Sequence, residues 1–308
     1  MSRILSHRDK SEPENNRQPS FGFRAWRGHP SAMGGTHTHT DLEWNFVAKG
    51  AMRYFLAGRF VTIPTGRLAV FWGGVPHQLV DAEEPCECLW VTLPLAWFLD
   101  WGFAPAAVER LLRGELLVEP DGSSMATAAE ERLLARWIAD LASGEPELRR
   151  IALLEVESRM RRLVRSAVAS SAVNAAGAVD ASAPATAPGE LRPVERAAEY
   201  IGGHYTENDL SVEDVARAVE LHPNYLMALF RRRCGMTVWE YVTRLRVSRA
   251  QRRLLTSRDK VLSVAMESGF GSASRFYEAF RRYGGGSPRA YRRTGGEPRR
   301  SLAKPQSR

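Results

Sequence analysis

Short apolar runs broken by Gly and Pro fill residues 21–93. They read EWNFVAKG, MRYFLAG, RFVTIPTG, RLAVFWGGVP and CECLWVTLP, and they are rich in Val, Phe, Trp and Tyr. Short strands at this spacing, separated by turn residues, are typical of a β-barrel or a β-sandwich. The pattern therefore predicts a β-domain in the N-terminal half.

The spacing changes to a helical one after Trp97. It is clearest at 128–141 and 148–168, where apolar residues such as Leu148, Ile151 and Leu154 recur at intervals near three and four. Stripes of this kind predict amphipathic helices that either cover the barrel or pair two subunits.

The composition changes again between residues 167 and 193, where Ala, Ser, Gly and Pro dominate and no bulky aromatic residue occurs. Such a segment has too little apolar bulk to form a core and is predicted to be a linker. It divides the chain into an N-terminal domain at 1–166, the linker at 167–193, a helical domain at 194–295, and a basic disordered tail at 296–308.

The helical domain contains one pattern twice. Ser211 precedes VEDVARAVE and, with Asp214 three residues later, forms a close relative of the capping box; a second helix follows at 224–233. About fifty residues later Ser263 is expected to cap VAMESGF, Gly269 takes the turn, and SASRFYEAFRRY supplies another helix. This is helix-turn-helix spacing, in which the second helix enters a major groove.

A long helix is predicted between the two units. It opens at the capping pair Thr237 and Glu240 and runs to about Leu255. Roughly 19 residues at 1.5 Å each give about 28 Å, near the ~34 Å repeat of DNA. We therefore expect both recognition helices to reach adjacent major grooves on one face of the duplex.

Charge is distributed unevenly along the chain. Residues 191–308 carry 23 basic and 12 acidic side chains, hence +11, whereas residues 1–190 carry 20 and 23, hence −3. A small domain at +11 favours a polyanion, and double-stranded DNA is the first partner to test.

The cysteines and the lack of long apolar runs indicate the cellular compartment in which the protein works. Three cysteines are an odd number, and Cys86 and Cys88 lie too close to bridge each other easily, which favours a reducing compartment. Neither a signal peptide nor a membrane-spanning run of about 18 apolar residues is apparent. We expect a cytoplasmic protein.

The helical half resembles the AraC-type transcription regulators. The resemblance rests on GFGSASRFYEAFRRYGGGSPRAYR at 269–292, supported by residues 210–255, and covers about one hundred residues. Glu220 departs from the family, which usually has Gly in the first turn. The resemblance implies base contacts from the first recognition helix at Asn224, Met227 and Ala228, and from the second at Ser272, Ala273, Ser274, Arg275 and Glu278.

Side-chain chemistry sorts these positions by the contact that each can make. Asn224 suits a bidentate contact with adenine and Arg275 one with guanine, whereas Met227, Ala228 and Ala273 can make only apolar contacts with thymine methyl groups. Arginines at helix ends and along the connecting helix are expected at phosphates. These are Arg231, Arg244, Arg246, Arg249, Arg281 and Arg282.

The segment HTHTDLEWNFVAKG holds the candidate ligand site. On a strand His37 and His39 face the same way, and Glu43 can return to that side. With His77 this spacing resembles the cupin barrel motif, whose three His and one Glu bind a divalent transition metal such as zinc, iron, nickel or manganese. The alternatives are contact with a small effector without a metal, and a structural role. Trp44 and Trp72 are candidate flat faces for a sugar ring.

The whole chain is thus expected to be α+β, with an N-terminal cupin-like β-barrel with flanking helices and a C-terminal all-α domain with two helix-turn-helix units. Residues 30–105 resemble a sugar-responsive subgroup of the family, whose effector is an α-galactoside and whose members activate carbohydrate-utilisation genes. The resemblance implies a non-enzymatic regulator, a homodimer and contact with RNA polymerase. The competing readings are a metal-dependent cupin enzyme with an attached DNA-binding domain, and a DNA-binding protein without an effector.

Overall fold

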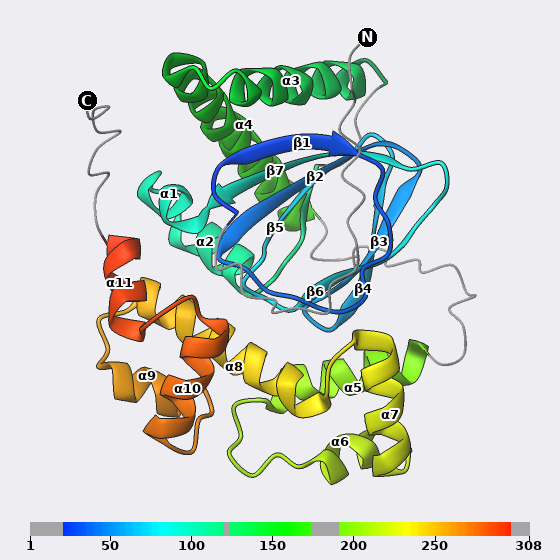
Figure 1. Cartoon of the computed structure of the whole chain (residues 1–308), viewed down its shortest axis with the longest axis vertical. Coiled ribbons are helices and arrows are strands. Elements are labelled where there is room, and N and C mark those ends of the chain that lie inside the picture. The colour runs from blue at the N-terminus through cyan, green and yellow to red at the C-terminus, as the bar shows by residue number, and fades with distance from the viewer. Residues whose placement is uncertain (1–20, 120–123, 174–190, 297–308) are drawn as a thin grey trace.

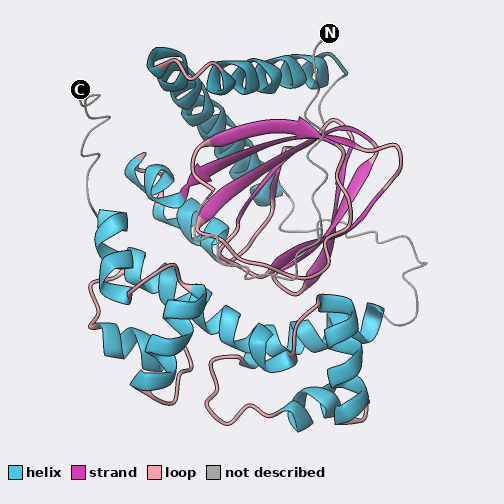
Figure 2. Ribbon diagram, in the orientation of Figure 1, coloured by secondary structure: helices cyan, strands magenta, loops and turns pink. Residues whose placement is uncertain are grey.

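The computed structural model describes residues 21–119, 124–173 and 191–296 (Figure 1). Its N-terminal part contains eight described strands in two antiparallel sheets, with orders β1-β7-β2-β5-β8 and β4-β3-β6. Figure 2 shows the two sheets enclosing a common interior, as the strand pattern predicts for a barrel. The strands are β1 (Arg24–Gly28), β2 (Asp41–Lys49), β3 (Ala51–Leu56), β4 (Arg59–Pro64), β5 (Leu68–Trp72), β6 (His77–Ala82), β7 (Glu87–Pro94) and β8 (Leu117–Val118).

Four helices follow and flank the barrel. They are α1 (Leu95–Asp100), α2 (Pro105–Leu112), α3 (Ser124–Ala142) and α4 (Pro146–Val173). Trp137 of α3 and Met160 of α4 are fully buried in the same apolar cluster as Trp44 of β2. The helices at 128–141 and 148–168 predicted from apolar spacing therefore cover the larger sheet.

The C-terminal half is helical throughout the residues that the structure describes. Its helices are α5 (Leu191–His204), α6 (Val212–Ala218), α7 (Pro223–Cys234), α8 (Val238–Thr256), α9 (Val261–Glu267), α10 (Ala273–Tyr283) and α11 (Pro288–Gly296). One apolar cluster is built around Phe230 and Tyr241, and a second around Phe276 and Phe280. The long helix α8 contributes to both clusters and so joins the two helix-turn-helix units (Figure 1).

The ends of two helices reach into the segment that composition predicts as a linker. Helix α4 continues to Val173 and α5 begins at Leu191, while residues 174–190 lie outside the described part of the chain. Most of the tail predicted at 296–308 also lies outside it. Among the helices that the structure describes, we find none with the length and hydropathy of a transmembrane span.

Capping explains one predicted helix start and corrects another. The Ser211 hydroxyl accepts a bond from the Asp214 amide, and the Asp214 carboxylate accepts one from the Ser211 amide, which completes the predicted capping box. Ser263 does not cap: α9 begins two residues earlier, after Lys260, and the Ser263 hydroxyl bonds Glu267 within the helix. Val264 and Ala265 are the buried residues of α9, so packing fixes its position without a side-chain cap.

The turns of the two helix-turn-helix units both contain a residue with a left-handed backbone, but its type differs. Gly269 has φ +90° in the second turn, and a Cβ there would lie 2.8 Å from the Thr206 Cα. Glu220 takes the corresponding place in the first turn with φ +58°. Left-handed backbone costs an L-residue roughly 1–2 kcal/mol that Gly does not incur. The departure from the family pattern at Glu220 is therefore a strained position.

We predict that Glu220→Gly stabilises the protein by about 1 kcal/mol, because relief of the left-handed strain exceeds the added freedom of the unfolded chain. Urea unfolding followed by circular dichroism measures the change. Glu220→Ala is the matched control, since it removes the carboxylate but keeps the Cβ and should give no such gain. Equal stabilities for Glu220→Gly and Glu220→Ala would contradict this assignment of strain.

Candidate nucleic-acid interface and histidine pocket

Helix α7 presents a two-sided surface. His222 caps it by accepting a bond from the Asn224 amide at 3.3 Å, and Gly235 ends it with φ +67°. Leu226, Leu229 and Phe230 are buried against the domain core, whereas the residues predicted to read bases are exposed on the opposite face. These are Asn224, Met227 and Ala228.

Helix α10 repeats this arrangement in the second unit. Ser272 caps it by accepting a bond from the Arg275 amide at 3.4 Å. Phe276, Ala279 and Phe280 are buried, and Ser272 and Ala273 are half-buried at the helix start. The remaining predicted base-reading positions are exposed on the outer face, namely Ser274, Arg275 and Glu278.

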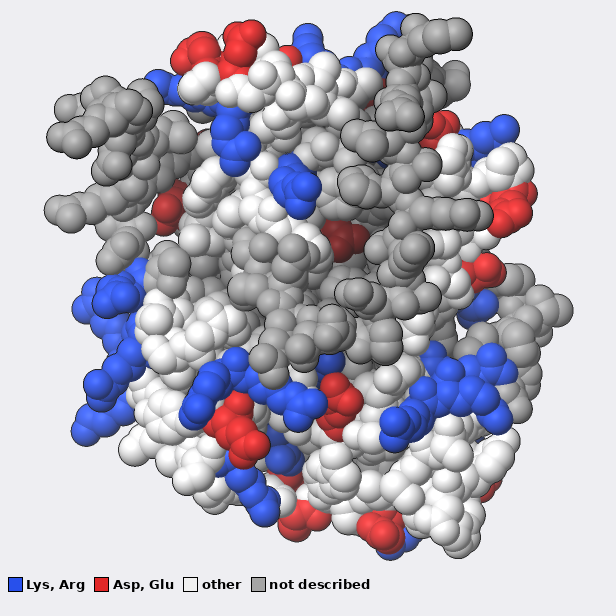
Figure 3. Space-filling view, in the orientation of Figure 1, with Lys and Arg blue, Asp and Glu red and all other residues white. Residues whose placement is uncertain are grey.

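The structure separates the predicted phosphate contacts into two groups. Arg231, Arg281 and Arg282 are exposed on the recognition helices. Figure 3 shows most of the basic side chains on its face over the C-terminal helices, with acidic groups between them. Exposed guanidinium groups of this kind suit phosphate contacts.

Three other arginines are bound within the domain. Arg244 is only 6% exposed, pairs with Glu240 at 3.0 Å and lies 4.8 Å from the centre of the Tyr283 ring. Arg246 donates to the carbonyls of residues 205 and 207, and Arg249 donates to that of Glu267. The structure thus does not bring Arg244 to the surface, where the sequence pattern places it, because this side chain joins α8 to α10.

The three predicted histidines meet at one end of the barrel. His37 and His77 form a β-bridge, and their ring centres are 4.2 Å apart. The His39 ring lies 5.0 Å from that of His77, and one nitrogen from each of the three rings lies within 4.8 Å of the others. The Glu43 carboxylate is 3.2 Å from His39 Nε2 and 3.7 Å from His77 Nε2. All four residues thus converge as predicted.

Several polar atoms of this pocket lack a partner within the described chain. His77 Nδ1 donates to the Val75 carbonyl at 2.9 Å, which leaves the lone pair on Nε2. His77 Nε2, His39 Nδ1 and His37 Nδ1 are buried without a hydrogen-bond partner there. Buried polar atoms without partners are costly, and three of them at one place indicate a site that takes up a polar ligand or an ion.

Burial sets the charge of the pocket. It lowers the pKa of His37 well below its ordinary value, with added repulsion from His77 and His39, and it lowers the pKa of His77 to about 4. Burial alone would raise the pKa of Glu43, but the hydrogen bond from His39 and the charge of His77 outweigh it and the pKa is lowered. At neutral pH the pocket therefore offers neutral His37 and His77 imidazoles beside an ionised carboxylate.

Four further residues, which the sequence analysis did not predict, surround the histidines and Glu43. Glu43 accepts hydrogen bonds from Asn45 at 3.3 Å and from the Tyr54 hydroxyl at 3.2 Å. The Phe71 ring lies 5.0 Å from that of His77, and the Phe21 ring 4.8 Å from that of His39. Asn45 follows Glu43 by two residues, so strand alternation places both on the same face.

The same alternation places Trp44 and Trp72 on the other face of the sheet. Phe71 pairs with Glu43, whereas Trp72 pairs with Leu42 and Trp44 with Val70. Trp44 is fully buried with its ring 6.1 Å from that of Trp137 in α3, and Trp72 donates to the Thr40 carbonyl at 3.3 Å. The structure does not bring these two tryptophans to the histidines.

One close contact joins the pocket to the first recognition helix. The amide and the hydroxyl of Thr36 both donate to the Cys234 carbonyl, at 3.1 and 2.8 Å. Gly35 packs on Gly235, where an added Cβ would lie 2.5 Å from the Gly35 Cα. We call this contact between residues 35–36 and 234–235 the clasp. It lies one residue from His37 and at the C-terminal end of α7.

Comparisons with known proteins agree with both halves of this arrangement. A cupin domain family matches residues 26–92, and a helix-turn-helix domain family matches residues 215–294. The melibiose operon regulatory protein of Escherichia coli is 29% identical over 91% of this chain and 89% of its own length.

Two further relatives match about a third of this chain. The HTH-type transcriptional activator AarP of Providencia stuartii is 34% identical over 30% of this chain and 68% of its own length. The raffinose operon transcriptional regulatory protein of Pediococcus pentosaceus is 32% identical over 32% of this chain and 35% of its own length.

The low pKa of His77 predicts a pH-dependent stability. The unfolded chain binds a proton at this residue near pH 6.5, but the folded chain does so only near pH 4. Between these values the unfolded state holds more protons, so the free energy of unfolding falls as the pH is lowered, by about 3 kcal/mol in all.

Urea unfolding at pH 7 and pH 4, in the presence of a chelator, measures this effect. His77→Gln removes the titrating ring and should lose about 3 kcal/mol less than the wild type over the same interval. The same loss in both proteins would show that His77 takes up its proton at an ordinary pH in the folded state.

Proposed function

Because the chain belongs to the AraC-type family of transcription regulators, we propose that a small sugar in the histidine pocket controls its binding to operator DNA. The observation that carries this proposal is the clasp, which connects the pocket to the first recognition helix. Thr36 precedes the pocket residue His37, and its two hydrogen bonds end on the last residue of α7.

DNA binding follows from the two recognition helices. We propose that α7 and α10 enter adjacent major grooves, since α8 joins them and each has an exposed face that carries predicted base-reading residues. Arg275 has the geometry to bind guanine and Asn224 to bind adenine. Arg231, Arg281 and Arg282 then contact phosphates, which supply affinity without reading sequence.

A small sugar suits the chemistry of the pocket. Neutral imidazoles, the Glu43 carboxylate, Asn45 and Tyr54 offer both donors and acceptors for hydroxyl groups, and the rings of Phe21 and Phe71 offer apolar faces. Relatives are named for the melibiose and raffinose operons. An α-galactoside is therefore the first effector to test.

The same donors would also fit a divalent transition metal. Three histidines each offer a nitrogen, and three of the imidazole nitrogens have no other partner within the described chain. Glu43 would be the fourth ligand, and the ion would supply a positive centre for sugar hydroxyl groups. One nitrogen from each of the three rings lies within 4.8 Å of the others, so the three histidines would hold such an ion together with Glu43.

The names of the similar proteins favour a role as a ligand sensor over a role as an enzyme. The similar proteins are named as regulators, although a cupin domain is also compatible with an enzyme. A sensor releases its sugar unchanged, so chromatography of the sugar after incubation with the metal-loaded protein separates the two readings. We place the regulator in the cytoplasm, together with its DNA and RNA polymerase.

Helix α4 carries the proposed dimer contact. Ile151 and Leu154 lie near one another on its outer face and are 40% and 54% exposed, which is unusual for large apolar side chains three residues apart. We expect the full chain to give twice the 34.4 kDa monomer mass in light scattering, and Leu154→Glu to give the monomer mass. A monomeric wild type at micromolar concentration would remove the proposal.

The assigned DNA contacts predict two kinds of loss of DNA affinity, one specific for the operator and one equal on all duplexes. Arg275→Ala should weaken operator binding by about 1–3 kcal/mol and relax the preference at one base pair. Arg281→Ala should weaken operator and random DNA equally and reduce the salt dependence by about one phosphate contact. Fluorescence anisotropy with both duplexes measures these changes. An equal loss on both duplexes for Arg275→Ala would make it a phosphate contact.

Substitutions in the pocket and in the clasp should change the response of the protein to a panel of α-galactosides in different ways. His39→Ala should abolish the thermal shift, which for wild type at 100 Kd corresponds to about 2.7 kcal/mol. Thr36→Val removes the hydroxyl donor at nearly constant volume, so it should keep the thermal shift but reduce the effect of sugar on DNA affinity. A normal response in both variants would refute the assignment.

Removal of metal by a chelator distinguishes sugar binding through a metal ion from direct binding by the pocket residues. If an ion takes part, a chelator should lower the sugar-induced thermal shift, and substitution of any of the four ligands should lower the metal content. If the residues bind the sugar directly, the shift should be unchanged by chelator.

A further inference from the structure

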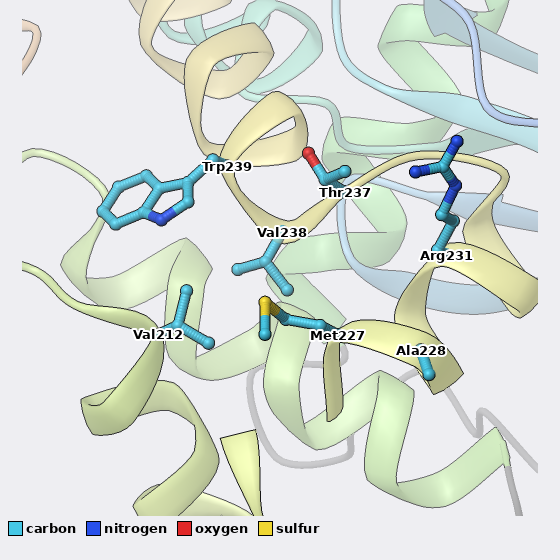
Figure 4. Close-up of a pocket in the computed structure, with 7 residues that line it drawn as sticks. All are labelled: Val212, Met227, Ala228, Arg231, Thr237, Val238 and Trp239. Atoms are coloured by element: carbon cyan, nitrogen blue, oxygen red, sulfur yellow. The ribbon is translucent and has the colours of Figure 1, made fainter. Parts of the chain in front are cut away.

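A small apolar pocket opens beside the first recognition helix. It has a volume of about 260 Å³ and lies between α6, α7 and the start of α8 (Figure 4). Figure 4 shows the side chains of Val212, Val238 and Met227 pointing toward one another, with the Trp239 ring at one side. Trp239 and Met227 are each 42% exposed. The full lining is Val212, Met227, Ala228, Arg231, Thr237, Val238 and Trp239.

This pocket is continuous with the face of α7 that is predicted to read bases. Met227 and Ala228 follow Asn224 by three and four residues, so they share its helix face, and Arg231 lies one turn further along. DNA that receives Asn224 in its major groove must therefore bring one strand of its backbone close to the pocket.

The second helix-turn-helix unit gives an independent indication of which side faces DNA. Thr237 accepts a bond from the amide of residue 240 at 3.1 Å, and Ser287 accepts one from the amide of residue 290 at the same distance. The residue two places after each cap is exposed: it is Trp239 in the first unit and Arg289 in the second. A cation at that place in the second unit suits a phosphate, so equivalent docking places Trp239 at the backbone as well.

We propose that the pocket receives deoxyribose of the strand that flanks the groove entered by α7, with Trp239 packed against the sugar. This inference rests on DNA binding by α7. A DNA strand alternates anionic phosphates with apolar C–H surfaces of the sugar, and the pocket matches this with an apolar floor and one guanidinium, that of Arg231. The contact is independent of base sequence and adds affinity without adding charge.

Affinity measurements at several salt concentrations test the proposal on the full chain. Trp239→Ala should weaken binding to operator and to random duplex by a similar factor, on the order of tenfold, which is the lower end of the loss seen when an aromatic ring stacked on a base is removed. The salt dependence should stay at its wild-type value, because no charge is removed, whereas Arg231→Ala should reduce it by about one phosphate contact. Trp239→Phe should retain most of the affinity.

Hydroxyl-radical footprinting gives a direct readout, since these radicals cleave DNA by attack on deoxyribose. One or two nucleotides beside the α7 groove should be protected by wild type and by Trp239→Phe but become cleavable with Trp239→Ala, while the rest of the footprint stays. Trp26→Ala is the matched control, because Trp26 is 40% exposed on the barrel strand β1 and should change neither footprint nor affinity.

Each other outcome overturns the proposal. A loss confined to the operator would indicate a thymine methyl contact in place of the sugar. Unchanged affinity and footprint with loss of transcription activation would indicate an apolar side chain of RNA polymerase as the occupant, and a lower mass without DNA would indicate a second copy of the chain. Absence of DNA binding by wild type would refute the proposed function itself, which keeps the two failures distinct.

Discussion

The close approach of Gly35 to Gly235 brings the barrel domain into direct contact with the end of α7. Gly235 has no room for a side chain, because an added Cβ would lie 2.5 Å from the Gly35 Cα, and it also ends α7 with a left-handed backbone. The approach brings Thr36 to the Cys234 carbonyl and places His37 next to a contact that crosses between the domains. A ligand that moves His37 must therefore strain or shift the end of a recognition helix.

Other contacts also join the barrel to the C-terminal helices. Phe55 and Phe60 of the β3–β4 hairpin belong to the apolar cluster of the first helix-turn-helix unit, and the Phe55 ring lies 6.0 Å from that of Tyr241. The second unit has its own cluster around Phe276 and Phe280. The first unit thus shares its apolar cluster with the barrel hairpin, and α11 of the second unit also lies against α1. An effector that shifts the clasp would act on α7, and through α8 on the spacing between the two recognition helices.

Much of this arrangement was predictable from local patterns. Strands in residues 41–94, the capping box at Ser211 and the exposed faces of α7 and α10 follow from alternation, capping chemistry and helical periodicity. Convergence of His37, His39, Glu43 and His77 followed from the spacing of a known motif. Alternation also places Trp44 opposite to Glu43, so the sequence already contained the evidence against Trp44 as a pocket residue.

Other features depend on contacts between distant residues and have no local signal. Arg244 sits among arginines that pattern alone assigns to phosphates, yet it is buried because Glu240 and Tyr283 bind it from α8 and α10. The clasp joins residues about 200 positions apart, and nothing in either Gly-containing segment indicates its partner. Phe21 and Phe71 come to the pocket from separate segments, so their place there also has no local signal in the sequence.

Hydrogen exchange of the full chain, with and without a sugar that stabilises it, shows whether ligand binding reaches the clasp. The Thr36 amide is bonded to Cys234 across the clasp, so its exchange rate reports the integrity of that contact. If the clasp couples the two domains, sugar should change exchange at residues 34–37 and at the end of α7 together. Protection confined to the barrel residues around His39 and His77, with the clasp and α7 unchanged, would contradict it.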